Sequence, residues 1–332
     1  MLAYIARRIV MMIPILLLIS MVSFFVIELP PGDWVSFQIE TLRMSGVQVS
    51  EDEAIRLTRM YGLDKPLYVR YLRWMEGILL RGDFGWSFQW QRPVRDILKE
   101  RIPLTVFISL LSLIFSWVIA IPIGIYSATH QYSILDYVFT FIGFIGLATP
   151  GFLLALILAW AFFKFFNFSA LGLFSMEYID APWSWAKFVD MLKHIVMPMI
   201  MVGLSGTGVT IRVMRANLLD ELRKPYVITA RAKGLPWMRI LFKYPVRVAI
   251  NPMISTVSWV LPGIVSGEVL IAIVLSLQTT GPVLLRAVLA QDMYLAGSIV
   301  MILSTLTVVG ALIADILLAA LDPRIRYEGV QK

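Results

Sequence analysis

The chain has 332 residues and no cysteine; 59% of its residues are hydrophobic, only 15% are charged, and its formal net charge is +7. Soluble domains are about 45–50% apolar and about 25% charged, so this composition indicates an integral membrane protein and excludes a disulfide framework or a thiol nucleophile. Lysines and arginines gather beside apolar segments, as the positive-inside rule describes for membrane proteins, and this placement argues against a nucleic-acid partner.

Six stretches are long and apolar enough to cross about 30 Å of hydrocarbon as helices. Arg7 and Arg8 before the first stretch also fit a signal peptide, but that stretch is long and no small-residue cleavage site follows it, so we expect a retained helix. The sequence therefore predicts an all-α integral membrane protein with six transmembrane helices. They cover approximately residues 9–27, 104–127, 135–163, 195–214, 252–277 and 295–321.

The distribution of basic residues assigns a side of the membrane to each loop. Residues 212–247 contain nine lysines and arginines against two acids, whereas the loops at 164–190 and 276–294 contain two and one basic residues. We therefore expect residues 212–247 in the cytoplasm. Basic residues flank both ends of the chain, and six spans place both termini on that same side.

The longest segment between predicted spans, residues 30–101, is nearly neutral, with 11 basic and 10 acidic residues. Helical patterning over residues 51–60 and 67–80, with Ser50 as N-cap and Glu53 at the capping-box position, predicts a small external helical lobe. A poorly packed connector is the alternative. The expected organisation is a first transmembrane helix at 1–29, an external segment at 30–101, a five-helix core at 102–322 with a cytoplasmic loop at 216–247, and a cytoplasmic tail at 323–332.

Sequence motifs for nucleotide binding and hydrolysis are absent, including G-x-x-x-x-G-K-[ST], H-E-x-x-H and G-x-S-x-G. His130 and His194 are far apart in sequence and make a weak case for a metal site. We therefore expect neither an enzyme nor a cofactor bound by this chain. The function classes that stay open are a pore, a carrier and a subunit of a larger protein complex.

Ionisable residues in the predicted spans mark candidate functional positions, because a charge at mid-bilayer costs about 2.5–3.5 kcal/mol on insertion scales. Glu268 in the fifth span is the deepest, and it either faces a translocation pathway or bonds to neighbouring helices. Asp315 near the end of the sixth span is expected to tether that end or to reach the interface. Arg212 and Arg215 are expected to anchor the fourth span at the membrane surface.

The fourth span also contains a run of small residues, Ser205, Gly206, Thr207 and Gly208. Small residues allow close helix packing in membranes, while Ser205 and Thr207, with Glu268, are also candidates for a translocation pathway. A secondary carrier usually shows matching halves with broken helices, and we find no such halves in the sequence. A carrier or channel working alone is therefore the less favoured alternative.

The cytoplasmic loop contains RKPYVITARAKGLPWMRILFKYP, residues 223–245, with six basic residues and no acid. Pro225 suits the first turn of a helix, Gly234 suits a left-handed C-terminal cap, and Pro236 prevents continuation. These signals predict a helix of about 12–14 Å at 1.5 Å per residue, which is too short to be stable without packing.

The predicted short helix has two faces. Tyr226, Val227 and Ala230 would form an apolar face, and the polar side chains of Thr229, Arg231 and Lys233 would lie apart from it. The helix therefore either rests on its own membrane domain or docks to another protein.

The stretch YVITARAKGLPWMRILFKYPVRVAINP resembles the cytoplasmic motif of permease subunits in binding-protein-dependent ABC importers of the dipeptide, oligopeptide and nickel family. The family pattern is close to Y-x-x-T-A-R-A-K-G-L, followed at a fixed distance by a proline, here Pro252. GLDKPLYVRYLRWMEGILLRGDFGWSF in the external segment, RIPLTV before the second span and LDPRIRYE at the C-terminus also match, so the resemblance covers nearly the whole chain.

The resemblance implies a transmembrane subunit that forms half of a translocation pathway with a second permease subunit, normally a related but different chain. It also implies two cytoplasmic ATPase subunits that bind ATP and Mg²⁺, an extracytoplasmic solute-binding protein, and a location in the cell membrane of a prokaryote. The short helix would be a coupling helix that contacts the ATPase through Tyr226, Thr229, Ala230, Arg231, Ala232, Lys233, Gly234 and Leu235.

The sequence departs from the family pattern in two places. Ile228 stands six residues before Gly234, where the broader importer motif has glutamate, as is common in the peptide branch. The sequence after Glu268, VLIAIVLSLQTTGPVLLRAVLAQDMYLAG, lacks the tryptophan-proline-glycine-leucine-glycine turn of peptide permeases. It resembles the members of the same family that carry oligosaccharides such as β-glucosides. We therefore expect an importer of oligopeptides, with oligosaccharides as the alternative substrate.

Overall fold

The computed structural model describes a largely helical protein, and the only sheet in its described ranges is one short antiparallel pairing of β1 (Trp86–Ser87) with β2 (Arg92–Pro93). The predicted all-α class is therefore confirmed. The chain divides into two compact units: unit 1 comprises residues 1–8, 105–278 and 307–332, and unit 2 comprises residues 9–104 and 279–306. The described residues are 2–29, 32, 34–45, 51–60, 62–167, 171–179, 181–257 and 269–321.

Three helices in the described ranges each contain a segment long and apolar enough to cross a membrane: α1 (Leu2–Glu28), α5 (Val94–Thr129) and α16 (Met293–Leu321). Two bent pairs of helices raise this number to five if each pair counts as one span. The predicted fifth span contains residues 258–268, which lie outside the described residues. The prediction of six spans therefore stays a prediction.

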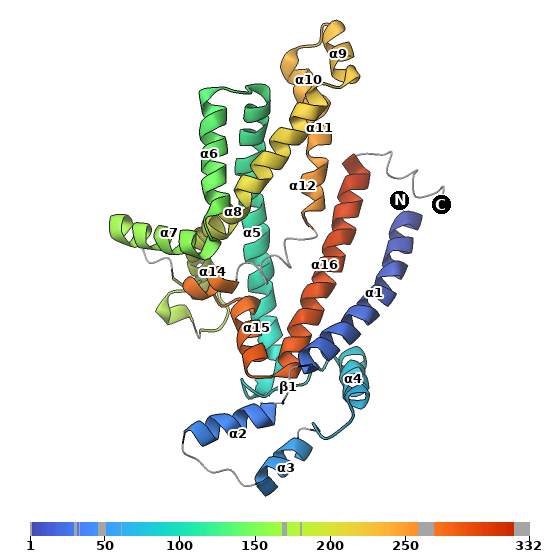
Figure 1. Ribbon diagram of the computed structural model, residues 1–332, viewed down its shortest axis with the longest axis vertical. Helices are drawn as coiled ribbons and strands as arrows, with labels where there is room; N and C mark the ends of the chain where they lie inside the picture. The colour runs from blue at the N-terminus through green and yellow to red at the C-terminus, as the bar shows by residue number, and fades with distance from the viewer. Residues whose placement is uncertain are drawn as a thin grey trace. The chain divides into compact units, whose positions relative to one another are not determined.

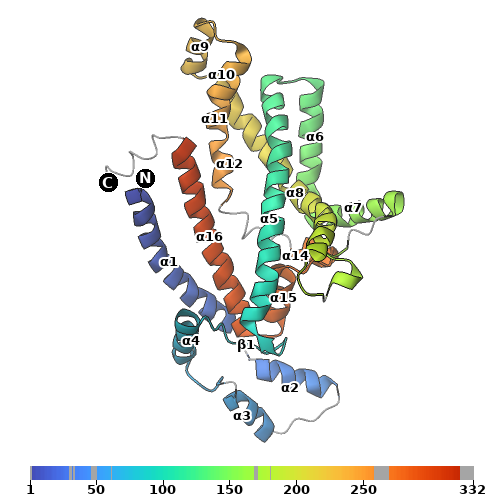
Figure 2. The same ribbon diagram turned by 180° about the vertical axis from the view of Figure 1, so that it is seen from behind.

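The apolar stretch expected to form the third span is broken rather than continuous. It consists of α6 (Ile134–Ala148) and α7 (Gly151–Phe166), whose axes differ by 108°. Pro150 has no N–H to donate and disfavours a helical conformation at Thr149, which is extended with φ −91° and ψ 125°. As a result, α7 runs sideways from the end of α6, as both ribbon views show (Figures 1 and 2).

The fourth span lies within a longer helix, α8 (Trp185–Leu222), whose first turn is capped by the Ser184 side chain accepting from the Lys187 N–H. Its two halves, residues 185–204 and 206–222, are bent by 51°. Helix α8 packs along α6, and the two helices are joined by an ion pair. Arg215 donates through Nε and one terminal nitrogen to the two carboxylate oxygens of Asp136, at 2.9 and 2.8 Å.

Small residues bring α6 and α8 close together, as the sequence predicted for Gly208. A Cβ placed on Gly208 would lie 2.7 Å from the carbonyl oxygen of Gly143, whereas one on Gly206 would meet no atom within 4 Å. Gly208→Ala should therefore lower the free energy of unfolding by about 1–3 kcal/mol, because an extra methyl group is forced against backbone. Thermal unfolding of the purified subunit in detergent measures this loss. Gly206→Ala is the matched control, and equal losses in the two variants would contradict the packing.

After α8, the chain forms a series of short helices: α9 (Pro225–Ala232), α10 (Trp237–Lys243), α11 (Pro245–Ala249), α12 (Asn251–Ser255) and, beyond the residues that are not described, α14 (Val269–Val274). Figure 1 shows α9 and α10 at the far end of α8 and α11. Proline is the first residue of α9 and α11 and the second residue of α12, and Pro236 directly precedes α10. A proline suits the first turn of a helix, where its missing N–H leaves no hydrogen bond unmade.

The other segments of unit 1 are ordered by polar contacts. The Ser175 N–H and hydroxyl both donate to Asp190 of α8, next to a short 3₁₀ helix at Met176–Tyr178. Arg8 of α1 and Asp315 of α16 form an ion pair at 3.1 Å. The tethering role expected for Asp315 is thereby confirmed.

Unit 2 contains the segment expected to be an external helical lobe. Its helices are α2 (Trp34–Met44), α3 (Glu51–Met60) and α4 (Leu67–Glu76), which continues as a π-helical turn at Gly77–Arg81. Helices α3 and α4 confirm the two predicted helices, whereas α2 was not predicted. Ser50, the expected N-cap of α3, lies outside the described residues. Helix α15 (Thr280–Leu289) completes the unit.

Aromatic side chains form the core of unit 2. Phe24 of α1 packs on Tyr71 and Trp74 of α4, and Trp34 of α2 packs on Phe88 beside β1. A buried ion pair adds to the first cluster: Arg70 of α4 donates to both carboxylate oxygens of Glu28, at 3.0 and 2.6 Å. These contacts hold α4 against the end of α1, so the segment is a packed lobe rather than a loose connector.

Asp292, immediately before α16, is a buried carboxyl that joins three parts of unit 2. It accepts hydrogen bonds from the Ser87 hydroxyl at 2.6 Å, the Gln89 N–H at 3.0 Å and the Leu295 N–H at 3.3 Å. Burial raises the pKa of this carboxyl above its ordinary value, although the hydrogen bonds oppose that shift. The folded protein therefore binds this proton more tightly than the unfolded chain does.

This raised pKa gives a defined pH dependence. The stabilisation from Asp292 is complete below its unfolded-state pKa of about 4 and is lost as the pH rises through the higher folded-state pKa. Asp292→Asn does not titrate, so the melting temperature of the wild-type protein minus that of this variant should fall as the pH is raised from acid to neutral. A difference that stays constant over this interval would contradict the assignment.

Candidate functional site

The short helix α9 begins and ends where the sequence predicts. Pro225 occupies the first helical turn, and Gly234 has φ +73°, a left-handed conformation that favours glycine. The Gly234 N–H donates to the Arg231 carbonyl at 2.9 Å, and the Leu235 N–H donates to the Ala230 carbonyl at 3.4 Å. These two bonds form a Schellman cap, which satisfies carbonyls that the helix end would otherwise leave free.

Helix α9 is held on α10 by a small apolar cluster. Val227 and Ala230 of α9 are buried against Ile240 of α10, with Leu235 and Tyr244 packed around them. Because an eight-residue helix is marginal in isolation, this contact supplies the stability that the helix lacks by itself. The platform provided by α10 therefore fixes the direction in which the rest of α9 points.

Tyr226 does not belong to the buried face, so the predicted apolar face of Tyr226, Val227 and Ala230 is corrected. Its side chain is 38% exposed, and its hydroxyl donates a hydrogen bond to Glu221 at the end of α8. Partial burial and this hydrogen bond raise the pKa of the Tyr226 phenol far above its ordinary value. The phenol therefore stays protonated and acts as a donor at physiological pH.

The outward side of α9 and the start of α10 form an exposed surface of mixed character, which we call the docking face. Ile228 and Met238 are 63% and 61% exposed, and the Arg231 guanidinium stacks 4.2 Å above the ring of Trp237. Exposed apolar side chains beside cations are typical of surfaces that bind another protein. The face comprises Tyr226, Ile228, Thr229, Arg231, Ala232, Lys233, Gly234, Trp237 and Met238.

Sequence reasoning missed part of this face. Ile228 and Met238 carry no polar or conformational signal, and only the packing of α9 and α10 shows that both side chains are exposed. Leu235, expected in the ATPase contact, is partly buried against the cluster beneath α9, and its place in that contact stays a prediction. Ala230 is likewise 7% exposed and supports the helix from below.

A second apolar cluster packs α10, the helix beneath α9, against the long helices of unit 1. Leu241 of α10 and Val246 of α11 pack with Met214 and Leu218 of α8 and Ala128 of α5. Each of these five side chains is at most 5% exposed. This cluster fixes α10 and α11 on α8 and α5, because well-packed interiors are close to incompressible.

The predicted pathway residues are only partly described. Glu268 and the side chain of Ser205 lie outside the described part of the structure. Thr207 is buried between helices: its hydroxyl donates to the Gly203 carbonyl at 2.6 Å and lies 3.2 Å from the hydroxyl of Ser116 on α5. This geometry is that of helix packing, and a place for Thr207 on a pathway stays a prediction.

Among the described residues, no group of three or more His, Cys, Asp or Glu side chains is arranged to hold a metal ion. The two histidines have other contacts. His130 stacks on Tyr126 with ring centroids 4.5 Å apart, and His194 lies one helical turn from Asp190, with Nδ1 2.9 Å from its carbonyl oxygen.

The fold is that of an integral membrane protein with several apolar helices. A short helix, α9, follows the long bent helix α8 and packs on α10. Two adjacent family models match it: "Binding-protein-dependent transport system inner membrane component" over residues 120–327, and the corresponding N-terminal model over residues 1–110. The chain belongs to this family of ABC transporter permeases, in its peptide branch, and is a multi-pass protein of the cell membrane.

Relatives that match over nearly their whole length support this assignment. The chain is 34% identical to the oligopeptide transport system permease protein AppB of Bacillus subtilis, over 98% of this chain and 99% of that protein. It is 31% identical to the peptidoglycan transport system permease protein YejB of Agrobacterium fabrum, over 98% of each. It is 28% identical to the oligopeptide transport system permease protein OppB of Haemophilus influenzae, over 98% and 100%.

Proposed function

We propose that this chain forms half of the membrane pathway of an ATP-driven importer, with α9 as the helix that docks into an ATPase subunit. The observation that carries the proposal is the geometry of α9: a capped helix, anchored from below by Val227 and Ala230, that presents an exposed face. Six spans, cytoplasmic termini, a second permease subunit, two ATPase subunits and an extracytoplasmic solute-binding protein complete the proposed assembly. ATP and Mg²⁺ are bound by the ATPase subunits.

The core beneath α9 supplies the mechanism of coupling. Closure of the two ATPase subunits around ATP displaces the docking face, and the cluster of Leu241 and Val246 with Met214 and Leu218 transmits this displacement to α8. Because the side chains interlock, α9 to α12 move with the cytoplasmic half of α8 rather than sliding over it. The movement of α8 opens the pathway to the outside.

Oligopeptides are the proposed substrates. Two of the relatives above are named as oligopeptide permeases and one as a peptidoglycan permease. The alternative, oligosaccharides such as β-glucosides, rests on the sequence that follows Glu268, which departs from the pattern of peptide permeases.

Uptake measurements separate these substrates. Deleting the gene for this chain should abolish uptake of a labelled tripeptide or pentapeptide while leaving uptake of a labelled β-linked oligosaccharide unchanged. Restoring the gene is the control for secondary effects. Loss of oligosaccharide uptake with intact peptide uptake would instead select the alternative substrate, and uptake that persists when the ATPase subunits are deleted would contradict ATP-driven import.

A further inference from the structure

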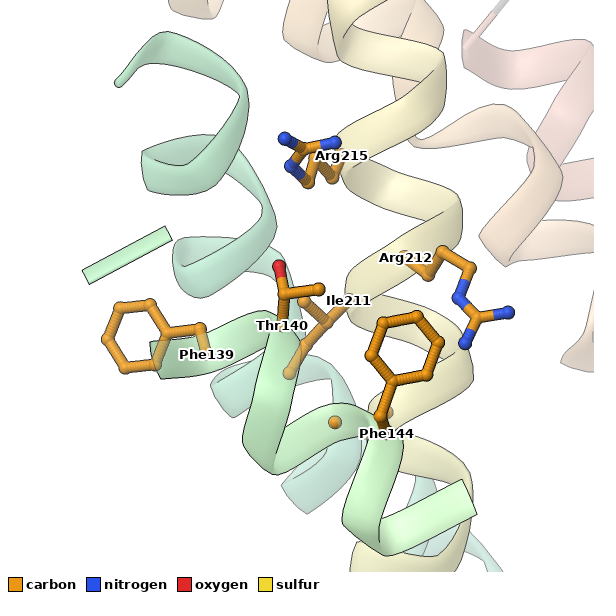
Figure 3. A pocket seen from close by; sticks show the side chains of 8 residues that line it. Phe139, Thr140, Phe144, Ile211, Arg212 and Arg215 are labelled. Carbon is orange, nitrogen blue, oxygen red and sulfur yellow. The ribbon is translucent and has the colours of Figure 1, made fainter. Parts of the chain in front are cut away.

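A pocket of about 180 Å³ lies in the groove between α6 and α8, near the ion pair that joins them. Its floor is apolar and includes Phe139, Phe144 and Ile211, and the close approach of Gly143 and Gly208 keeps the groove free of side chains at its centre. Figure 3 shows Arg212 beside the Phe144 ring and Arg215 farther along α8. The pocket therefore combines an apolar lining with two arginines from α8.

The two arginines are in different electrostatic situations. Arg215 is paired with Asp136 through two hydrogen bonds, so its charge is already balanced within the protein. Arg212 is exposed, and its guanidinium lies 4.7 Å from the centre of the Phe144 ring. Within the described residues it forms no ion pair, so one positive charge at the pocket has no anionic partner.

The surface around the pocket is suited to lipid. On α6, Phe141, Ile142 and Ile145 are 67%, 59% and 49% exposed, and Val209 on α8 is 47% exposed. Asp136, in the first turn of α6, marks the end of the bundle that the proposed orientation places in the cytoplasm. Arg212 lies about one helical turn deeper in the membrane than Arg215, the partner of Asp136. A guanidinium at this depth, beside apolar helix faces, is stabilised by an anion at the membrane surface.

We propose that this groove is a binding site for an anionic phospholipid of the cytoplasmic leaflet. Arg212 binds the headgroup phosphate by charge-assisted hydrogen bonds, and an acyl chain lies along Phe144 and Ile211 toward the Gly143–Gly208 contact. The apolar lining favours a lipid over a free phosphate ion, because a free ion gains nothing from the aromatic floor. The site also places a lipid against α8, the helix that moves in the proposed import cycle.

Native mass spectrometry of the intact importer complex tests this site. The complex is equilibrated with vesicles of phosphatidylcholine alone or mixed with phosphatidylglycerol, extracted in mild detergent, and the bound phospholipid is identified. We expect the wild-type complex to retain phosphatidylglycerol preferentially. Arg212→Ala should weaken this retention about fivefold to tenfold, whereas Arg239→Ala, which removes an exposed arginine of α10, should leave it unchanged.

Three outcomes would overturn the proposal. The first is retention of phosphatidylglycerol that is equal in the wild-type and Arg212→Ala complexes. The second is displacement of the lipid by inorganic phosphate at a concentration matched to the lipid, which would show a simple phosphate site. The third is loss of the second permease subunit from the Arg212→Ala complex, which would show that the groove is a subunit interface. Each readout is independent of ATP hydrolysis and uptake, so failure here leaves the proposed import function standing.

Discussion

Replacing Gly234 by valine should uncouple ATP hydrolysis from import. Gly234 has φ +73°, and a residue with a Cβ pays about 1–2 kcal/mol for this left-handed conformation, with β-branched valine at the unfavourable end. The cap formed by the Gly234 and Leu235 N–H groups would then be lost or distorted. Because α9 is only eight residues long, a cost of this size shifts its folded population by roughly a factor of 5–30.

The same position offers a matched control. Asparagine adopts the left-handed conformation more readily than other residues with a side chain, so Gly234→Asn should keep most of the coupling. Substrate-stimulated ATPase activity and uptake in proteoliposomes that contain the whole complex measure the effect. Gly234→Val should abolish both stimulation and uptake, and Gly234→Asn should retain them. Full coupling in the valine variant, or equal loss in the two variants, would contradict the role assigned to the cap.

Removing the Arg215 side chain should destabilise the protein more than Gly208→Ala does. The Asp136 carboxylate is 3% exposed and depends on Arg215, whose side chain is 26% exposed and donates two hydrogen bonds to it. Arg215→Ala would leave a buried charge without its partner, which costs about 3–5 kcal/mol. Arg215→Lys should recover only part of this loss, because an ammonium group does not reproduce the two parallel bonds.

A double-mutant cycle isolates the pair. The thermal unfolding midpoint of the purified subunit in detergent should fall steeply in Arg215→Ala and rise again when Asp136→Asn is added, because the second change removes the unpaired charge. Arg239→Ala, an exposed arginine on α10, controls for loss of a positive charge alone. If the two substitutions have additive effects, or if Arg215→Ala is no worse than Arg239→Ala, the ion pair does not stabilise the contact of α6 with α8.

Local features of the structure could be predicted from the sequence where a residue restricts its own backbone. Pro225 and Gly234 define α9 because one fixes φ for the first turn and the other accepts the left-handed cap. The break at Thr149 and Pro150 carried the same kind of signal, yet the continuous apolar run around it concealed the change of direction. Hydropathy measures length and composition, and it does not report where a helix turns.

Contacts between distant residues could not be predicted in this way. Asp136 and Arg215 are 79 positions apart, and Asp292 meets Ser87 across 205 positions, so only the tertiary fold brings each pair together. The outward direction of Ile228 and Tyr226 likewise depends on how α9 is rotated on α10. Helix α2 was missed because its buried residues, Trp34 and Val35, pack on Phe88 rather than following a strong periodic pattern.

Site-specific cross-linking tests most directly whether α9 docks to an ATPase subunit. The chain has no cysteine, so Ala232→Cys creates a single thiol on the docking face, and Leu79→Cys creates one at a residue of unit 2 that is 71% exposed. Each variant is assembled with its ATPase subunits, labelled with a thiol-reactive benzophenone and irradiated. We expect a cross-link from position 232 to an ATPase subunit and none from position 79. An uncross-linked ATPase in the first variant, or a cross-linked ATPase in the second, would contradict the docking of α9.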